Sequence, residues 1–209
     1  MEVKQVSRQT LKRLPVYLNY LKSISGQPNI SAAAIADALK MGDVQVRKDL
    51  AQISSGGRPK TGYVTSSLIK DIEAFLGCRD TNAAVLVGAG NMGRAILSYV
   101  GFSGYGLQIL AAFDTDPEKI DTKIGSTPVF DAARLTNLLC RMNIKIGIIA
   151  VPPQAAQEVC DKLTQNGVKA IWNFAPVHLC VPEDVLAENE DMAYSLSILS
   201  QRLSESMSK

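Results

Sequence analysis

The stretch Ala83-Ala84-Val85-Leu86-Val87-Gly88-Ala89-Gly90-Asn91-Met92-Gly93-Arg94-Ala95-Ile96 decides the fold of this 209-residue chain. Residues 83–87 are an apolar run of the length of a buried strand, and a helix-favouring run begins at Arg94. Between them the glycines fall in the pattern Gly-x-Gly-x-x-Gly. This motif binds the pyrophosphate of a dinucleotide when it lies between a strand and a helix. The stretch therefore predicts the start of a dinucleotide-binding α/β domain.

Each glycine of this loop has an expected task. Gly88 permits the tight turn, Gly90 lets the pyrophosphate approach the backbone, and Gly93 lets the helix pack on the strand. The N-terminus of that helix offers free amide groups and the positive end of its dipole to the phosphates. The candidate loop residues are Gly88, Ala89, Gly90, Asn91, Met92 and Gly93.

An acidic residue follows at the spacing that a ribose contact requires. A second apolar run, residues 107–113, ends at Asp114, which lies 21 residues after Gly93. An acid at this strand end accepts hydrogen bonds from the adenosine ribose and repels a 2′-phosphate. Asp114 therefore favours NAD(H) over NADP(H) as the ligand. Asp116 or Glu118 could share this role, but Asp114 stands at the strand end.

Strands and helices continue to alternate towards the C-terminus. Strands are predicted over residues 144–151 and 170–174, with a helix over 155–166 between them and a last helix over 192–207. We therefore expect a Rossmann-type parallel sheet, in which the carboxyl ends of the strands border the ligand crevice. The further candidates near the nicotinamide are Val151, Pro152, Asn173, Phe174, Ala175 and Pro176.

The N-terminal part predicts a helix-turn-helix. Residues 11–21 have apolar side chains at helical spacing, and Pro15 is placed to start or kink that helix. Ser31 is a good N-cap for the alanine-rich run 32–39. Gly42 suits a left-handed turn, after which Asp43 would cap a second helix over residues 44–53.

That second helix would present Gln45, Arg47 and Lys48 near its N-terminal end, where a recognition helix meets base edges and phosphates. The glycine-rich segment that follows, with Arg58, Lys60 and then β-prone residues, predicts a wing that reaches DNA. The alternative is a small helical cap whose charged side chains are simply solvated.

The overall charge conceals an asymmetry. The chain holds 22 Lys and Arg against 20 Asp and Glu, a net charge of +2. Residues 1–80 hold 12 basic and 7 acidic residues (+5), whereas residues 81–209 hold 10 and 13 (−3). A basic half joined to an acidic half favours two domains with different partners, one of them a polyanion.

Several classes of protein are not favoured. The longest apolar run has six residues and ends at two prolines, so no membrane span is expected. Residues 1–5 contain no apolar signal region, and we expect a cytoplasmic protein. The four cysteines lack zinc-site or disulfide-scaffold spacing and are expected to pack as small apolar residues, with Cys78 alone of interest for reactivity.

An enzyme is also not favoured. A nicotinamide-dependent dehydrogenase needs an acid or base near the hydride carbon. The only histidine, His178, is flanked by Val177 and Leu179 and is expected to be structural. A small oxidoreductase stays the less favoured alternative, because no second domain is large enough to build a substrate site.

The chain resembles the Rex family of redox-sensing transcriptional repressors over nearly its whole length. The matching segments are Arg13-Leu14-Pro15-x-Tyr17, Val46-Arg47-Lys48-Asp49-Leu50, Val87-Gly88-x-Gly90-Asn91-x-Gly93-x-Ala95 with Tyr99, Phe113-Asp114-x-Asp116-Pro117 with Lys119, Ala150-Val151-Pro152, Asn173-Phe174-Ala175-Pro176-Val177 and Asn189-x-Asp191.

This resemblance implies a winged-helix domain over residues 1–80, an NAD(H)-binding Rossmann domain over 81–190 and a dimerisation helix over 191–209. It implies a homodimer with swapped C-terminal helices that binds a palindromic operator on double-stranded DNA when NADH is low. NADH would close the Rossmann pair and move the DNA-binding domains out of register. Tyr99 joins the candidate cofactor residues on this basis.

The chain departs from the family pattern at three sites that matter for function. The recognition helix usually ends in Tyr-Phe-Gly, and here it reads Gln52-Ile53-Ser54. The family usually has Arg at the position of Asn19, where it links the DNA-binding domain to the acid matching Asp191 and the tyrosine matching Tyr99. With Asn19 that charge pair cannot form. The wing, which contains Pro59 and Lys60, also differs from the usual glycine-rich form. A paralogue that senses another nucleotide is therefore the alternative within the family.

Overall fold

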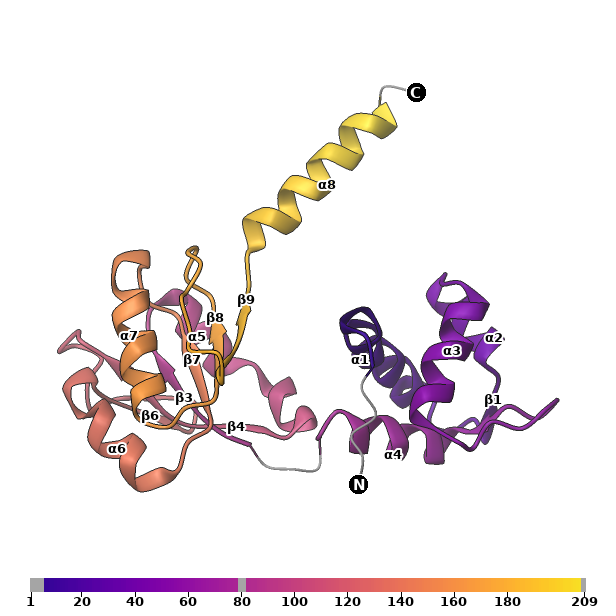
Figure 1. Cartoon of the computed structure of the whole chain (residues 1–209), viewed down its shortest axis with the longest axis horizontal. Coiled ribbons are helices and arrows are strands. Elements are labelled where there is room, and N and C mark those ends of the chain that lie inside the picture. Colours follow the sequence, from indigo (N-terminus) through magenta and orange to yellow (C-terminus); the bar gives the residue numbers. More distant parts are fainter. Residues whose placement is uncertain (1–5, 79–81, 208–209) are drawn as a thin grey trace. The chain divides into compact units, whose positions relative to one another are not determined.

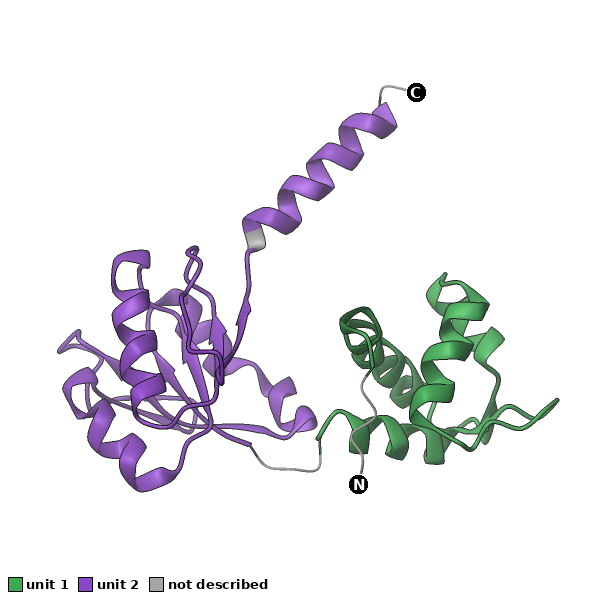
Figure 2. Ribbon diagram, in the orientation of Figure 1, with its two compact units in different colours: residues 1–80 green, residues 81–209 purple. Residues whose placement is uncertain are grey.

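The computed structural model describes residues 6–78 and 82–207, and it divides into two compact units, residues 1–80 and 81–209 (Figure 2). The division expected near position 80 falls at residues 79–81, outside the described ranges. Residues 1–5, on which the absence of a signal sequence was argued, also lie outside them. Among the described residues, no helix is long and apolar enough to cross a membrane.

Unit 1 is a helical domain with a two-stranded antiparallel ribbon (Figure 1). Its core consists of apolar side chains from all four helices, of which Leu14, Ile35, Leu50 and Leu68 are at most 1% exposed. Its elements are α1 (Arg8–Ser23), β1 (Asn29–Ile30), α2 (Ala32–Leu39), α3 (Asp43–Ile53), β2 (Tyr63–Val64) and α4 (Thr65–Phe75).

The helix-turn-helix is present, but three of its local features differ from expectation. Helix α1 is capped by Ser7, whose Oγ accepts a hydrogen bond from the Thr10 amide, so Pro15 lies inside the helix rather than at its start. Lys40, not Gly42, takes the left-handed conformation (φ 53°) after α2. Gly42 is the N-cap of α3, and Asp43 is its first residue.

Unit 2 contains a seven-stranded sheet in the order β5-β6-β4-β3-β7-β8-β9 (Figure 1). All neighbouring strands are parallel except β5 and β6, which confirms the predicted Rossmann-type parallel sheet. The elements are β3 (Asn82–Val87), α5 (Asn91–Ser98), η1 (Val100–Tyr105), β4 (Leu107–Asp114), β5 (Lys123–Ile124), β6 (Thr127–Asp131), η2 (Ala132–Arg134), α6 (Leu135–Met142), β7 (Ile146–Ile149), α7 (Pro153–Gln165), β8 (Ala170–Asn173), β9 (Leu186–Asn189) and α8 (Met192–Met207).

The order of the strands fixes where a ligand can bind. From β3 the chain moves outward on one side through β4 to β6, then returns to place β7 on the other side of β3. This reversal leaves a crevice at the carboxyl ends of β3, β4 and β7. Apolar clusters on both faces of the sheet hold these strands in place, with Val85 and Phe113 in one and Leu86 and Ile148 in the other.

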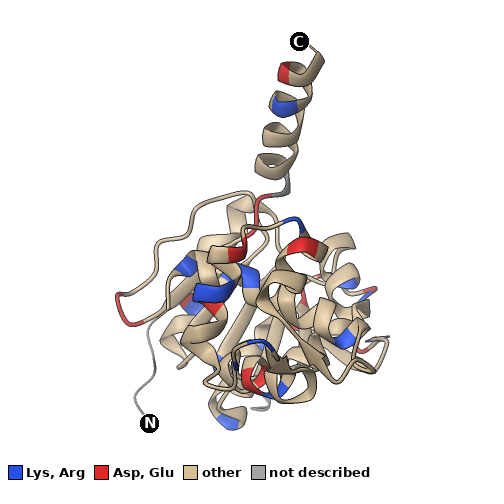
Figure 3. Ribbon diagram, turned by 90° about the vertical axis from the view of Figure 1, so that its right-hand side faces the viewer, with Lys and Arg blue, Asp and Glu red and all other residues tan. Residues whose placement is uncertain are grey.

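Helix α8 leaves much of its apolar surface uncovered. Leu196, Leu199 and Leu203 are 57–64% exposed, and Met207 is 79% exposed. The helix carries only two charged residues, Arg202 and Glu205 (Figure 3). A helix of this composition is not stabilised by the packing that most helices in folded proteins rely on. Its role in dimerisation stays a prediction.

Candidate functional site

A cavity of about 450 Å³ lies at the carboxyl ends of β3, β4 and β7. It contains five of the predicted cofactor residues, Gly88, Gly90, Asp114, Val151 and Pro152. Its full lining is Val87, Gly88, Gly90, Phe113, Asp114, Thr115, Asp116, Lys119, Ala132, Ala150, Val151, Pro152, Ala155, Glu158, Val159 and Lys162.

Two of the three glycines of the loop are required by the protein's own geometry, and the third is not. Gly88 has φ 101°, and a Cβ there would lie 2.4 Å from the Ala150 carbonyl oxygen. A Cβ at Gly93 would lie 1.9 Å from the Gly88 carbonyl oxygen, so α5 could not approach β3. A Cβ at Gly90 would have no heavy atom within 4 Å. Gly90 is therefore not needed by the protein's own packing, and the open space in front of it is available to a ligand.

Asp114 holds the glycine loop as well as facing the cavity. Its Oδ2 accepts a hydrogen bond from the Ala89 amide at 2.8 Å, and its Oδ1 accepts one from the Asp116 amide at 2.9 Å. Of the other predicted loop residues, Asn91 begins α5 and is exposed, and Met92 packs against the apolar cluster on one face of the sheet. Neither Asn91 nor Met92 lines the cavity.

The predicted residues 173–176 form a turn beside the cavity but do not line it. Asn173 is fully buried. Its Nδ2 donates hydrogen bonds to the Ala175 and Val177 carbonyls and to Asn189 Oδ1, and its Oδ1 accepts one from the Ala175 amide. Pro176 is exposed. Asn173 therefore shapes this turn, and its contact with a ligand stays a prediction.

Tyr99 belongs to a row of aromatic side chains. Its ring is 4.7 Å from that of Phe102, which is 5.5 Å from Trp172, which is 4.7 Å from Phe174. Trp172 also donates a hydrogen bond from Nε1 to Glu190. Tyr99 is 58% exposed and does not line the cavity, and its role in cofactor binding stays a prediction.

Two lysines of the cavity were not among the predicted site residues. Lys119 lies 3.4 Å from Asp114 Oδ2 and 3.1 Å from Asp116 Oδ2. Lys162, from α7, pairs with Glu158 at 2.7 Å. The sequence could have indicated Lys119, because it follows a run of acidic residues just after β4. It could not have indicated Lys162, because only the fold brings α7 to the same cavity.

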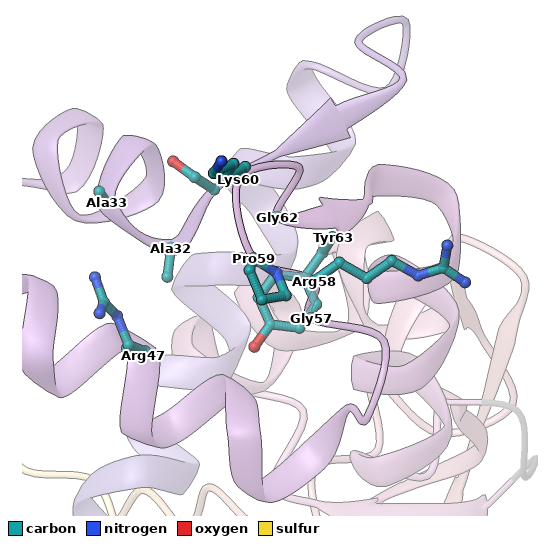
Figure 4. A pocket seen from close by; sticks show the side chains of 10 residues that line it. Ala32, Ala33, Arg47, Gly57, Arg58, Pro59, Lys60, Gly62 and Tyr63 are labelled. Carbon is teal, nitrogen blue, oxygen red and sulfur yellow. The ribbon is translucent and has the colours of Figure 1, made fainter.

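A second cavity, of about 440 Å³, lies in unit 1 between α2, α3 and the wing (Figure 4). It brings together three of the five predicted DNA-binding residues, Arg47, Arg58 and Lys60. The wing is closed by paired backbone hydrogen bonds between Arg58 and Gly62. In Figure 4 the Arg47 side chain points towards α2, whereas that of Arg58 extends in the opposite direction. Cations from α3 and from the wing therefore border this cavity and point in different directions.

Tight backbone approaches hold this wing in place. A Cβ at Gly62, which has φ 76°, would lie 2.3 Å from the Ile30 carbonyl oxygen. A Cβ at Gly57 would lie 2.8 Å from the ring of Tyr63, which is itself 8% exposed. Burial raises the pKa of Tyr63, although the nearby Arg47 cation acts in the opposite direction. The wing is thus anchored at its base while its charged side chains face outward.

Four side chains converge on the buried carboxylate of Asp49, which is 1% exposed. Arg13 binds it with two nitrogens, at 2.7 and 2.9 Å, and Tyr17 donates from its hydroxyl at 2.9 Å. Thr10 and Gln45 complete the set, at 3.1 and 2.9 Å. This Asp49 cluster joins α1 to α3, because three of the donors lie on α1.

The Asp49 cluster shifts the pKa values of its members. Burial alone would raise the pKa of Asp49, but the hydrogen bonds from Arg13, Tyr17, Gln45 and Thr10 outweigh it, and the pKa is lowered. Burial and the bond to Asp49 raise the pKa of Tyr17 to about 12. The cluster is therefore an anionic acceptor held by neutral and cationic donors throughout the physiological range.

The cluster also changes how the recognition helix is understood. Gln45 donates its amide to Asp49, so its side chain is held against the domain in this structure. Arg47 pairs with Asp43 at 2.7 Å on an exposed surface, and Lys48 is exposed. Arg47 and Lys48 are therefore better placed for DNA than Gln45, whose contact with a base would require it to leave Asp49.

The predicted switch residues lie one in each unit. Asn19 lies on the exposed side of α1. Asp191 caps α8, since its Oδ1 accepts hydrogen bonds from the amides of Ala193 and Tyr194. The pairing of these positions stays a prediction from the family resemblance.

The burial of the cysteines and of His178 tests the remaining expectations from the sequence. Cys160 is buried as expected, but Cys140 and Cys180 are exposed, which contradicts their expected apolar packing. Burial and Glu73 raise the pKa of Cys78, which disfavours the reactive thiolate there. His178 is exposed in the segment after β8 rather than packed in a core. Among the described residues no group of His, Cys, Asp and Glu could hold a metal ion.

Comparison with known proteins agrees with both halves of this description. Residues 79–177 match the family model described as a CoA binding domain, and residues 5–51 match a putative DNA-binding protein N-terminus. The redox-sensing transcriptional repressor Rex of Porphyromonas gingivalis is 37% identical over 201 residues, which cover 95% of this chain and 92% of the relative. That of Pelotomaculum thermopropionicum is 39% identical over 205 residues, covering 97% and 96%.

Solved structures agree over the same length. The structure of RSP in complex with β-NAD⁺ and operator DNA matches with a TM-score of 0.90 at 34% identity, covering 97% of this chain and 94% of RSP. RSP in complex with β-NADH matches with a TM-score of 0.87 at 33% identity, covering 97% and 96%. RSP is described as a Rex-family repressor.

Proposed function

Because the chain belongs to the Rex family of redox-sensing transcriptional repressors, we propose that it binds operator DNA through unit 1 and that NADH in the cavity of unit 2 releases it. The observation that carries this proposal is the open space in front of Gly90. No heavy atom of the protein lies within 4 Å of where a Cβ would be at this position of the glycine loop. The loop joins β3 to the N-terminus of α5, the arrangement that holds a pyrophosphate.

The switch requires a preference of NADH for one state of the protein. A ligand shifts a two-state equilibrium only by its difference in affinity for the two states, and a nearly complete switch needs about 5.5 kcal/mol. A dimer on a palindromic site is sensitive to small rotations, because half-sites are spaced by one helical turn of DNA. A modest movement between two copies of unit 1 therefore suffices to end operator binding.

We assign the uncovered apolar surface of α8 to the homodimer. The Rex-family resemblance supplies the partner, a second copy of this chain, and the exposed Leu196, Leu199 and Leu203 supply the surface. A repressor of this kind acts on DNA in the cytoplasm and carries out no catalysis. In support of the latter, His178 is exposed and lies outside the residues that line the cavity.

The test of this function is operator binding with and without NADH. A mobility-shift assay on the protein's own promoter region is expected to show a shifted complex with NAD⁺ that is lost as NADH is added. Binding that stays unchanged from micromolar to millimolar NADH would contradict the redox control. The alternative within the family, a different nucleotide signal, is suggested by Asn19, and native mass spectrometry of the purified protein would show such a ligand.

The wing and the recognition helix are expected to contribute differently. Arg58→Ala should weaken binding of all DNA sequences alike and reduce the slope of log K against log salt by about 1, because it removes a phosphate contact. Arg47→Ala should cost about 1–3 kcal/mol and lower the preference for the operator. Competition titrations at several salt concentrations measure both effects. Lys145→Ala, an exposed cation of unit 2, is the control and should change neither quantity.

A further inference from the structure

Two lysines of unit 1 hold a backbone conformation that favours glycine. Lys40, after α2, has φ 53°, and Lys60, at the tip of the wing, has φ 67°. In this left-handed region a Cβ crowds the backbone, so a lysine is strained there whereas a glycine is not. Both lysines are exposed. The packing of unit 1 therefore does not account for a lysine at either position.

The tip of the wing is held in this conformation from both ends. Backbone hydrogen bonds of 2.8 and 2.9 Å between Arg58 and Gly62 close the loop that contains Lys60. Pro59, directly before Lys60, has its own φ fixed by its ring. A Cβ on Gly62 would lie 2.3 Å from the Ile30 carbonyl oxygen, so the loop also lies tightly against β1. The wing therefore fixes the direction in which the Lys60 side chain leaves the backbone.

The Lys60 ammonium is available to a ligand. It borders the cavity of about 440 Å³ between α2, α3 and the wing (Figure 4). Within the part of the chain that the structure describes, this ammonium has no ion pair and no hydrogen-bond partner. Of the other two cations of the cavity, Arg47 pairs with Asp43 at 2.7 Å, and the Arg58 side chain extends away in Figure 4. Lys60 therefore supplies the uncompensated charge of this cavity.

An anion is the class of ligand that fits this cavity. No acidic residue is among the residues that line it. Ala32 and Ala33, the first two residues of α2, also line it, and the amides of a first helical turn have no acceptor within the helix. A phosphate oxygen accepts hydrogen bonds from an ammonium and from such amides. Because unit 1 is the proposed DNA-binding unit, the backbone of a duplex would bring a phosphate to this place.

Building on the proposed function, we propose that this cavity seats one phosphate of the operator backbone and that Lys60 binds it. The left-handed conformation at the tip of the wing is retained for this contact. Lys60 therefore raises the affinity for DNA while it lowers the stability of unit 1.

Lys60→Gly and Lys40→Gly in the full chain form a matched pair that tests this proposal. Each removes one exposed cation of unit 1 and one left-handed lysine, but only Lys60 lines the cavity. Neither substitution should lower the midpoint of thermal unfolding, because each relieves backbone strain. Lys60→Gly should weaken binding to the protein's own promoter region by roughly tenfold or more, the scale of a lost hydrogen bond to a charged group.

The dependence on salt gives a second readout of the same contact. Lys60→Gly should reduce the slope of log K against log salt by about 1, since one phosphate is no longer neutralised. Lys40→Gly should leave this slope unchanged. Lys60→Arg, which keeps the charge, should retain operator binding. Mobility shifts at several salt concentrations and circular dichroism during heating measure these effects.

The outcomes separate this inference from the function on which it rests. Operator binding that Lys60→Gly and Lys40→Gly weaken equally would overturn the phosphate contact alone. A lower unfolding midpoint for Lys60→Gly would assign Lys60 to the structure of the wing and also overturn the proposal. Calorimetry with inorganic phosphate tests the other source of the ligand: phosphate binding that Lys60→Gly abolishes, with unchanged operator affinity, would assign the cavity to a free anion instead. If the unsubstituted protein did not bind its promoter region, the proposed function would fail as well.

Discussion

Gly90→Val is expected to abolish NADH binding while the protein remains folded and bound to its operator. Gly90 has φ −74° and ψ −162°, a conformation that valine adopts without strain. A Cβ at this position would contact no heavy atom of the protein within 4 Å, so the added methyl groups would project into the space where the pyrophosphate is expected. We expect the Kd of NADH to rise by about 100-fold or more, which corresponds to about 2.7 kcal/mol.

Two measurements together check this result. Calorimetry should show the loss of NADH binding, and a mobility shift should show operator binding that NADH no longer reverses. Gly93→Ala is the informative control, because its Cβ would lie 1.9 Å from the Gly88 carbonyl oxygen and should destabilise unit 2 itself. Gly90→Val with an NADH affinity within a few-fold of the unsubstituted protein would show that the pyrophosphate does not pass over Gly90.

Asp49→Ala is expected to have the largest effect on stability. Removing one member of a buried ion pair costs about 3–5 kcal/mol, because the remaining partners lose their acceptor. The Arg13 side chain is 22% exposed, so water can replace part of the lost interaction with Asp49. We therefore expect the free energy of unfolding to fall by about 3 kcal/mol. For a domain of this size the midpoint of thermal unfolding should fall by more than 10 °C. Circular dichroism during heating measures it.

Asp37→Ala is the matched control, because it removes an exposed carboxylate from α2 in the same unit and should change stability by at most about 0.5 kcal/mol. If Asp49→Ala unfolded within a few degrees of this control, the Asp49 cluster would not stabilise unit 1.

The Asp49 cluster also predicts the direction of a pH effect. The pKa of Asp49 is lowered in the folded state, so its contribution is fully present well above the ordinary carboxyl value near 4 and is lost as the pH falls below it. Unfolding measured between pH 7 and pH 3 should therefore show a steeper acid loss in the unsubstituted protein than in Asp49→Ala.

Local signals in the sequence were sufficient for the central strands β3, β4, β7 and β8 and the helices α5, α7 and α8, but they did not predict the strands β5, β6 and β9, the helix α6 or the order of the strands. The glycine loop and the alternation that follows it are short-range patterns, and the parallel sheet confirms them. The turn after α2 shows the limit of such signals, since the left-handed position falls on Lys40 although Gly42, two residues later, is the residue type that favours it.

The candidate sites were harder to predict from the sequence, because their contacts join distant parts of the chain. Asp49 binds donors from α1 more than 30 residues away, which no local pattern indicates. Its bond to Gln45 spans four residues of α3, a spacing at which helical side chains meet, and this local signal was missed. Likewise Asn173 follows a strand as a ligand-binding residue would, but only the fold shows that its amide is used within its own turn.

Trp172 provides an optical probe of the redox state. It is the only tryptophan in the chain, and its fluorescence therefore comes from one known place, in β8 beside Phe102 and Phe174. Reduced nicotinamide absorbs in the near ultraviolet, where indole emits, whereas the oxidised form does not. Quenching of this emission can therefore distinguish NADH from NAD⁺ in the intact protein without any label.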